Sequence, residues 1–305
     1  MKVALIGRSE ILYDCINKLI IDGHEIVLII TSKEAPEYTK TSSDFELIAK
    51  KLKIPFANGL PLTNHKELIL RSKADIAVSI NYSAIITQEI IDIFPLGILN
   101  AHGGDLPKYR GNACQAWAII NGENKIGLCI HKMTAELDSG DIIEREYIPI
   151  NLNTKIGEVL SWMNDRIPSM FLSSIDKLND DPKYILEEQS KNNKEILRCF
   201  PRKPEDAKIN WSESAENIIR LINASNKPFA GAFTYYQSQK IIIWDACITE
   251  DESNFLAIPG QVTLITADFI EVACGKGKLR IFEISNDKHE KMEGFIKSPR
   301  DRFTD

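Results

Sequence analysis

Close pairs of metal-binding residues are missing from this sequence of 305 residues. Its six cysteines are scattered with no Cys-x-x-Cys pair, and none of its five histidines forms a His-x-x-x-His pair. Zinc sites and redox dithiols depend on such close spacing. We therefore expect no metal site, and reduced thiols as in a cytoplasmic protein.

Long apolar runs and an excess of positive charge are absent as well. No stretch approaches the roughly 18 apolar residues of a membrane span, and the apolar run at residues 3–6 is too short for the core of a signal peptide. The net charge is −6, which disfavours a nucleic acid as the main partner. The first predicted strand ends in a single Gly7 rather than in Gly-x-Gly-x-x-Gly, so a dinucleotide site there is also disfavoured.

What the first two thirds of the chain do contain is an alternation of short apolar strands and amphipathic helices. Predicted strands cover residues 3–6, 25–30, 74–80, 97–100, 126–133 and 142–150, and predicted helices cover 9–21, 43–52, 87–93, 113–120 and 156–178. This alternation predicts an α/β fold with a doubly wound, mostly parallel sheet.

The pattern changes after a polar stretch at residues 179–193, which is typical of a linker or loop. One predicted helix, 214–223, is followed by short predicted strands at 232–236, 241–246, 260–265, 269–273 and 279–284. Turn residues separate these strands, which predicts a small β-rich domain of the oligonucleotide-binding (OB-like) barrel class. We expect two domains, residues 1–200 and 201–305.

Two polar side chains follow the predicted strand at 97–100. Asn100 and His102 fall where that strand reaches the carboxyl edge of the sheet, and their two-residue spacing places both on one side of an extended chain. An amide can donate to the oxyanion that forms when a nitrogen attacks a carbonyl carbon, and an imidazole can accept the proton of the amine. The pair therefore suggests acyl transfer to an amine.

A carboxylate in the tight Asp138-Ser139-Gly140-Asp141 loop could orient that histidine or hold a proton. Each segment alone is more often an ordinary turn with a hydrogen-bonded histidine. Their combination and order favour a catalytic interpretation.

Several motifs occur in a fixed order along the chain. They are Asn100-x-His102, Leu106-Pro107-x-Tyr109-Arg110-Gly111, His131-x-Met133 and Asp138-x-Gly140-Asp141-Ile142, followed by Pro201 to Asp206, Ile209-Asn210-Trp211 and Gly231 to Thr234. This order resembles the folate-dependent formyltransferases, which include glycinamide ribonucleotide, methionyl-tRNA and nucleotide-sugar formyltransferases. The later motifs resemble the linker and C-terminal domain of the last two branches, so the resemblance covers nearly the whole chain.

The resemblance implies roles for individual residues. Asn100, His102 and Asp138 match the catalytic residues of the family, and N10-formyltetrahydrofolate would be the formyl donor. Folate-binding residues are expected at Tyr82, Ser83, Ala84, Ile85, Ile86, Leu137 and Asp141, and acceptor-binding residues at Gly103, Gly104, Asp105, Lys108, Tyr109 and Arg110. The family usually has Ser-Leu before Leu-Pro, whereas this chain has Gly104-Asp105. We expect this carboxylate to alter the acceptor side of the site or the packing of the loop.

Two acceptors compete, a nucleotide-linked amino sugar and methionine on initiator tRNA. Enzymes that act on tRNA carry a basic insertion after the second strand, which supplies phosphate contacts, but residues 31–40 here contain two acidic and two basic residues. Trp117 resembles the sugar branch, since tRNA enzymes more often have Pro-Ile-Gln near this place. We therefore expect a nucleotide-linked amino sugar, with the sugar, the nucleotide and the amino position left open, and with a homodimer plausible by analogy.

Further alternatives are a non-catalytic folate- or nucleotide-binding protein and a hydrolase of formyl-folate. The joint presence of Asn100, His102 and Asp138 disfavours the binding protein. The hydrolases usually carry a different accessory domain.

Overall fold

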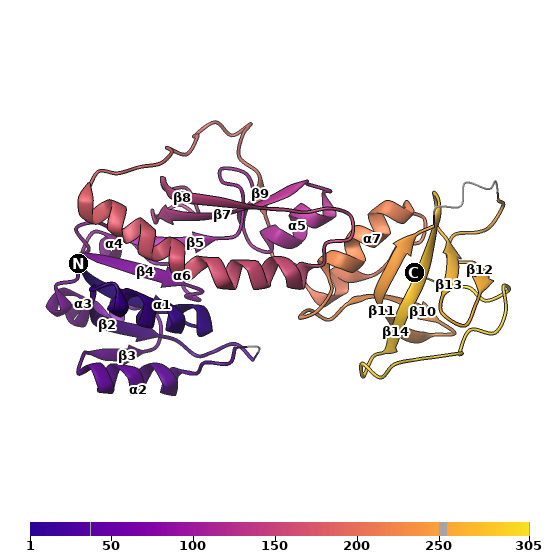
Figure 1. Ribbon diagram of the computed structural model, residues 1–305, viewed down its shortest axis with the longest axis horizontal. Coiled ribbons are helices and arrows are strands. Elements are labelled where there is room, and N and C mark those ends of the chain that lie inside the picture. The colour runs from indigo at the N-terminus through magenta and orange to yellow at the C-terminus, as the bar shows by residue number, and fades with distance from the viewer. Residues whose placement is uncertain (37, 250–254, 305) are drawn as a thin grey trace. The chain divides into compact units, whose positions relative to one another are not determined.

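The computed structural model describes residues 1–36, 38–249 and 255–304. Glu37, one of the two acidic residues counted in the stretch 31–40, lies outside this range. The chain forms two compact units (Figure 1). The first unit comprises Met1–Gly111, Gly127–Tyr147 and Ser161–Arg198, and the second comprises Asn112–Ile126, Ile148–Leu160 and Cys199–Asp305.

A seven-stranded sheet forms the centre of the first unit, in the order β3-β2-β1-β4-β5-β7-β8. Its strands are β1 (Lys2–Gly7), β2 (Glu25–Thr31), β3 (Phe56–Asn58), β4 (Ile76–Ile80), β5 (Ile98–His102), β7 (Lys125–Lys132) and β8 (Ile142–Pro149). The five strands from β3 to β5 pair in parallel, and β7 runs antiparallel to β5. The predicted doubly wound, mostly parallel sheet is confirmed.

Helices cover this sheet because each turns an apolar stripe toward it. They are α1 (Glu10–Ile21), α2 (Ser42–Leu52), α3 (Lys66–Ser72), α4 (Gln88–Ile91) and the long α6 (Ile156–Asp180), with a 3-10 turn η1 (Leu62–His65) before α3. In α1 the buried residues Leu12, Cys15, Ile16 and Leu19 recur with helical spacing. The middle of β1 is fully buried, and each such apolar side chain contributes about 1.5–3 kcal/mol.

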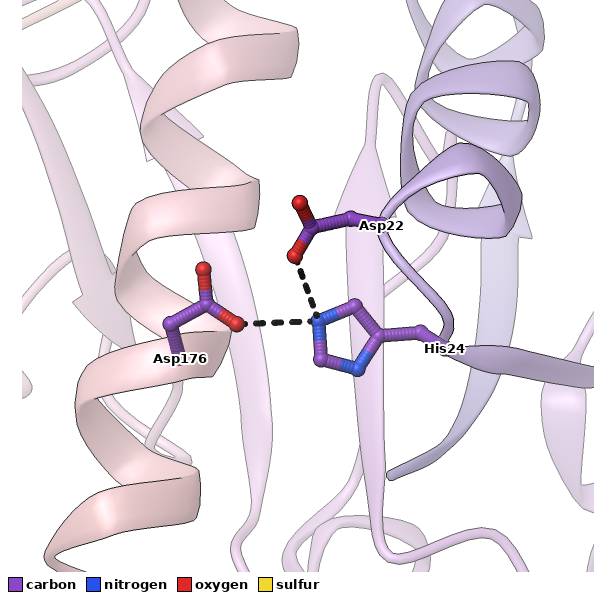
Figure 2. A group of neighbouring side chains, drawn as sticks. All are labelled: Asp22, His24 and Asp176. Carbon is purple, nitrogen blue, oxygen red and sulfur yellow. Dashed lines mark hydrogen bonds and ion pairs between the residues drawn. The ribbon is translucent and has the colours of Figure 1, made fainter.

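A hydrogen-bonded histidine connects α6 to the turn between α1 and β2 (Figure 2). The Nε2 atom of His24 lies 3.0 Å from a carboxylate oxygen of Asp176 on α6 and 3.8 Å from one of Asp22, which ends α1. The nitrogen and oxygen atoms of these three side chains that could bind a metal ion lie within 4.8 Å of one another. The hydrogen bond to Asp176 already satisfies Nε2, and we interpret the group as a structural contact.

The second unit contains an antiparallel sheet of five strands in the order β10-β11-β14-β13-β12. They are β10 (Ala232–Tyr236), β11 (Gln239–Ile248), β12 (Val262–Ile265), β13 (Ile270–Ala273) and β14 (Lys278–Asn286). Residues 301–304 join its two edges, because Thr304 pairs with Tyr235 on β10 and Arg302 pairs with Gln261 just before β12. The predicted β-rich C-terminal domain is confirmed, and its sheet is antiparallel.

Helical and short elements complete this second unit. Helix α5 (Cys114–Ile120) packs against α7 (Ala215–Ala224), and Ser214 caps α7 by accepting a hydrogen bond from the backbone N–H of Asn217 at 3.1 Å. A 3-10 turn, η2 (Pro204–Ala207), precedes α7. The short strand β6 (Arg110–Gly111) belongs to the first unit and pairs with β9 (Arg198–Cys199), which begins at the last residue of that unit.

Elements between residues 53 and 73 were not predicted. The structure has β3, η1 and α3 there, of three, four and seven residues. Elements this short do not repeat an apolar pattern often enough to be recognised. Within the described ranges, no helix is both long and apolar enough to cross a membrane.

The core of the second unit contains a stack of aromatic rings that links the segment before α7, the sheet and the last described residues. Trp211 and Phe303 stack with ring centroids 5.6 Å apart, and Tyr236 lies edge-on to Phe303 at 6.1 Å. Trp211 also donates from its indole to the hydroxyl of Thr234 at 2.9 Å. Phe303, which is 1% exposed, therefore anchors the segment that joins the sheet edges.

We predict that Phe303→Ala lowers the free energy of unfolding by about 3–5 kcal/mol, because it leaves a cavity against Trp211. Urea unfolding followed by circular dichroism measures this loss. Phe282→Ala is the matched control, since Phe282 is 44% exposed on β14. Equal losses in the two variants would contradict the proposed anchor.

Candidate active site

Strand β5 supplies two of the predicted catalytic side chains. It lies between β4 and β7, and in the register with β7, Asn100 is opposite His131 and His102 is opposite Cys129. Both side chains therefore emerge at the carboxyl end of β5, the edge at which open α/β sheets bind ligands.

The imidazole of His102 is held by the backbone of the loop that follows it. Its Nε2 lies 2.6 Å from the carbonyl oxygen of Tyr109. A carbonyl can only accept, so Nε2 carries the hydrogen, and Nδ1 of the neutral ring is left with its lone pair. Gly104 makes this contact possible, since a Cβ at that position would lie 2.5 Å from the Tyr109 oxygen and 2.6 Å from Nε2.

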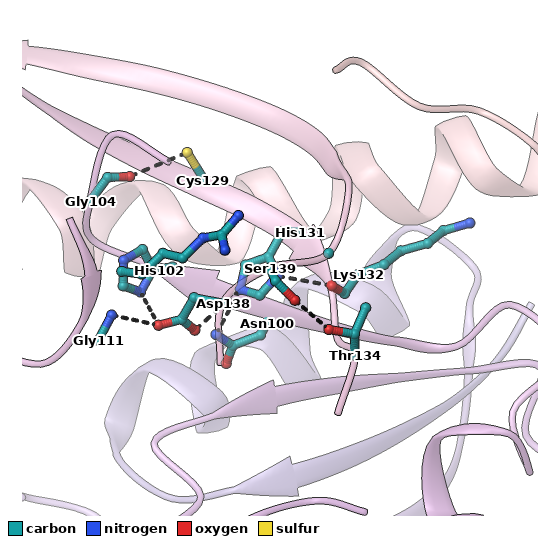
Figure 3. A network of polar contacts seen from close by, with 12 residues as sticks. Asn100, His102, Gly104, Gly111, Cys129, His131, Lys132, Thr134, Asp138 and Ser139 are labelled. Atoms are coloured by element: carbon teal, nitrogen blue, oxygen red, sulfur yellow. Dashed lines mark hydrogen bonds and ion pairs between the residues drawn. The ribbon is translucent and has the colours of Figure 1, made fainter. Parts of the chain in front are cut away.

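Asp138 reaches the same point from the loop between β7 and β8 (Figure 3). One carboxylate oxygen lies 3.5 Å from Nδ1 of His102 and accepts from the backbone N–H of Gly111 at 2.9 Å, and the other lies 3.6 Å from Nε2 of His131. Asp138 has a φ of +49°, and a Cβ on Gly140 would lie 1.8 Å from the Lys132 carbonyl oxygen. The loop is thus a tight turn built around this carboxylate.

Burial and charge set opposite trends in the pKa values of the pair. Burial lowers the pKa of His102 and outweighs the carboxylate of Asp138, which raises it. Burial would raise the pKa of Asp138, but its contacts with the His131 and His102 imidazoles and the hydrogen bond from the Gly111 N–H together lower it to about 2. At neutral pH the site therefore holds a neutral imidazole beside an ionised carboxylate.

His131 orients the amide of Asn100. Its Nδ1 donates to the carbonyl of Lys132 at 2.9 Å, and its Nε2 accepts from the Asn100 amide, which lies 3.2 Å away. His131 is 2% exposed. This contact fixes which end of the amide carries the hydrogens.

Sequence reasoning missed one residue of this network, Gln189. It is 6% exposed and donates to the carbonyls of Asp138 at 2.9 Å and Gly140 at 2.6 Å. Its oxygen accepts from Nε and Nη2 of Arg110 at 3.2 and 2.7 Å. Gln189 lies in the polar stretch that we interpreted as a linker or loop, where no pattern distinguishes it from its neighbours.

A cavity of about 1110 Å³ runs along the Asp138 loop. Its lining includes four cationic residues, Arg110, Lys132, Lys191 and Arg198, and two acidic ones, Glu136 and Asp141, together with Leu137, Ser139 and Gly140. Three of the predicted ligand-binding residues, Leu137, Asp141 and Arg110, therefore line it. The cavity can accommodate a large ligand that carries negative charge.

The predicted folate loop, residues 82–86, lies beside β4 and is not among the described residues that line this cavity, although Gln88 just after it is. Ile85 is 84% exposed, Ser83 is exposed and Ala84 is half-buried. Tyr82 donates to the Gly59 carbonyl at 3.2 Å, and burial raises its pKa to about 12. Ile86 packs into the hydrophobic core, so its side chain faces away from any ligand.

The predicted acceptor residues divide into buried and exposed positions. Gly103, Gly104 and the Tyr109 side chain are buried, and Lys108 is exposed. Asp105 pairs with Arg145 and accepts from the Tyr147 hydroxyl at 2.9 Å. The unusual carboxylate at position 105 thus serves the packing of its loop.

Both parts of the chain match the formyl transferase family. Residues 1–175 match the formyl transferase family, and residues 202–300 match the formyl transferase C-terminal domain. The methionyl-tRNA formyltransferase of Acetivibrio thermocellus is 28% identical over 96% of this chain and 94% of its own length.

Two solved structures share the fold. An N-formyltransferase from Helicobacter canadensis, in complex with folinic acid and dTDP-3-aminofucose, has a TM-score of 0.68 at 17% identity over 92% of this chain and 99% of its own. HypX from Aquifex aeolicus, in complex with tetrahydrofolic acid, has a TM-score of 0.61 at 16% identity over 95% of this chain. The chain spans 45% of that HypX chain.

The chain belongs to the formyl transferase family. It is a formyltransferase that uses formyltetrahydrofolate as its co-substrate, so the predictions of an enzyme and of its formyl donor are confirmed. The amine that receives the formyl group is not defined by family membership.

We predict that Gly104→Ala lowers kcat for formyl transfer by about 100-fold, because the new methyl group displaces the His102 ring from the Tyr109 carbonyl. Gly23→Ala is the control, since a Cβ there meets no atom within 4 Å and the backbone φ of +89° is strained for alanine. That variant should lose stability and keep its activity. Unchanged kcat in Gly104→Ala would show that the contact is dispensable.

We predict that NMR titration of His102 gives a midpoint below the ordinary pKa of about 6.5. Asp138→Asn should lower the midpoint further, because it removes the charge that raises this pKa. His102 has a higher pKa in the unfolded chain than in the folded protein, so on acidification the unfolded chain is protonated first. The free energy of unfolding that His102 contributes is therefore lost as the pH falls from about 6.5 to the pKa of the folded protein. A midpoint above 6.5 would contradict the dominance of burial.

Proposed function

We propose that this protein transfers the formyl group of formyltetrahydrofolate to the amino group of a nucleotide-linked amino sugar, with Asn100, His102 and Asp138 as the catalytic centre. The observation that carries the proposal is the arrangement of His102. Its ring is neutral, its Nε2 hydrogen is engaged by the Tyr109 carbonyl, and its Nδ1 faces an ionised carboxylate at 3.5 Å.

His102 acts as the general base through Nδ1. The acceptor nitrogen attacks the formyl carbon, and its proton passes to Nδ1. The imidazolium that results is stabilised by Asp138, whose own pKa is too low for it to take the proton itself. The same proton is then available to the folate nitrogen as the bond between that nitrogen and the formyl carbon breaks.

Asn100 stabilises the oxygen that becomes negative during the attack. One N–H of its amide is directed at His131, and among the described residues the second N–H makes no hydrogen bond. A donor oriented in advance, near the point where charge develops, is the arrangement that lowers the barrier of acyl transfer.

The formyl donor binds along the Asp138 loop in this proposal. Leu137 and Asp141 line the cavity there, and the backbone of residues 82–86 forms a further part of the folate site. The folate ligands named for the Helicobacter canadensis and Aquifex aeolicus structures support a folate site in this fold.

The charges of the chain favour a small anionic acceptor over tRNA. Four cations line the cavity, and Arg110 is suited to phosphate because of its forked donors. By contrast, the loop that follows β2 makes its contacts with residues of the first unit. Arg8 donates to the Lys33 carbonyl at 2.8 Å, and the ammonium group of Lys40 lies 4.6 Å from the centre of the Tyr13 ring. In residues 201–305, acidic residues outnumber basic ones by 16 to 14.

Methionyl-tRNA remains the second candidate acceptor. It is favoured by the match to a methionyl-tRNA formyltransferase over 96% of this chain. The dTDP-3-aminofucose named for the Helicobacter canadensis structure favours the sugar.

A competition for formyltetrahydrofolate between the two acceptor classes tests the proposal. We predict that the purified protein formylates a member of a panel of nucleoside-diphosphate amino sugars, and does so faster than it formylates methionyl-tRNA. Asn100→Ala is the catalytic control and should lose about 100- to 1,000-fold in turnover while remaining folded. Preferential formylation of methionyl-tRNA would overturn the choice of acceptor, and full turnover by Asn100→Ala would overturn the catalytic role of Asn100.

A further inference from the structure

Gln189 is placed by backbone pairing on both sides. Upstream, the backbone N–H of Ile142 donates to the Glu187 carbonyl at 2.9 Å, and that of Leu186 donates to the Ile142 carbonyl at 2.9 Å. Downstream, the backbone N–H of Arg110 donates to the Leu197 carbonyl at 2.9 Å. Residues 186–197 are thus attached at one end to the start of β8, next to the Asp138 loop, and at the other end to β6.

The carboxamide of Gln189 has only one consistent orientation. Arg110 offers donors alone, and the carbonyls of Asp138 and Gly140 are acceptors alone, so the Gln189 oxygen faces the guanidinium and its nitrogen faces the loop. The amide makes four hydrogen bonds, two through each end. The amide therefore connects the Asp138 loop to Arg110, and both of its N–H groups and both lone pairs of its oxygen are used in hydrogen bonds.

The two carbonyls that Gln189 holds flank the turn that presents the Asp138 carboxylate. Asp138 has a positive φ, and Gly140 packs against the Lys132 carbonyl. A non-glycine residue held at positive φ needs support from its surroundings. The carboxylate sits 3.5 Å from Nδ1 of His102, so a small change in this turn would change the contact directly.

We infer that Gln189 is a positioning residue for formyl transfer: its amide nitrogen holds the turn that presents the Asp138 carboxylate to His102, and its oxygen orients the Arg110 guanidinium. This inference rests on the proposed roles of Asp138 and His102. Gln189 acts through these residues and takes no part in the chemistry itself.

Two substitutions separate the two ends of the amide. Gln189→Ala removes all four hydrogen bonds. Gln189→Glu keeps an oxygen that accepts from Arg110. It replaces the amide nitrogen by a second carboxylate oxygen, which would be repelled by the Asp138 and Gly140 carbonyls. If holding the loop is the essential role, both variants lose about 100-fold in kcat, with the KM for formyltetrahydrofolate little changed. If the contact with Arg110 were the essential one, Gln189→Glu would retain activity, and the inference as stated would be overturned.

A second measurement requires no acceptor. Carbon-13 NMR titration of the Asp138 carboxyl in the free protein should give a pKa of about 2 in the wild type and a raised pKa in both Gln189 variants, because the carboxylate loses its contacts with the imidazoles and with the Gly111 N–H. Glu188→Ala is the control, since Glu188 is exposed next to Gln189. It should change neither kcat nor the titration.

The outcomes distinguish this inference from the proposed function. Failure of the wild type to formylate any amino sugar would refute the proposed acceptor, while the titration would still test Gln189, and kcat would be measured on whichever amine is formylated. Variants that unfold at lower temperature but keep the wild-type Asp138 titration and kcat would show a structural role only. That result would overturn the inference.

Discussion

One buried carboxylate determines the arrangement of the candidate site. Asp138 lies between two imidazoles and accepts a hydrogen bond from a backbone N–H, and these contacts outweigh the cost of burying its charge. Because it stays ionised, it can stabilise a proton on His102 without removing it. Burial meanwhile keeps His102 neutral at rest, so the two effects together give a base that is ready to act near neutral pH.

Backbone geometry, more than side-chain identity, brings these groups together. The Tyr109 carbonyl selects the tautomer of His102, the Lys132 carbonyl selects that of His131, and two glycines leave room for close approach. Both imidazoles are therefore held by main-chain carbonyls, which cannot rotate as side chains do. Such rigidity is the condition under which an oriented donor and base accelerate acyl transfer.

The sequence was sufficient to predict the parts of this design that repeat or that stand at a strand end. The parallel sheet follows from short apolar strands that alternate with helices, and Asn100 and His102 follow from their place at the end of β5. The sequence did not predict β3 and α3, which are too short for periodicity. It also could not distinguish Gln189, because its importance comes from the pairing of residues 186 and 187 with the start of β8, a contact between segments more than 40 residues apart.

The pairing of Asp105 with Arg145, Tyr147 and, through Arg145, Glu187 has a consequence for anyone who modifies this enzyme. Replacing Asp105 by leucine would remove one of the two carboxylates that pair with the Arg145 guanidinium, whose side chain is only 10% exposed. Arg145 and Asp105 thus act as a pair that joins β8 to the loop after β5. Grafting the acceptor loop of a relative onto this scaffold calls for exchanging the matching positions of β8 in the same step.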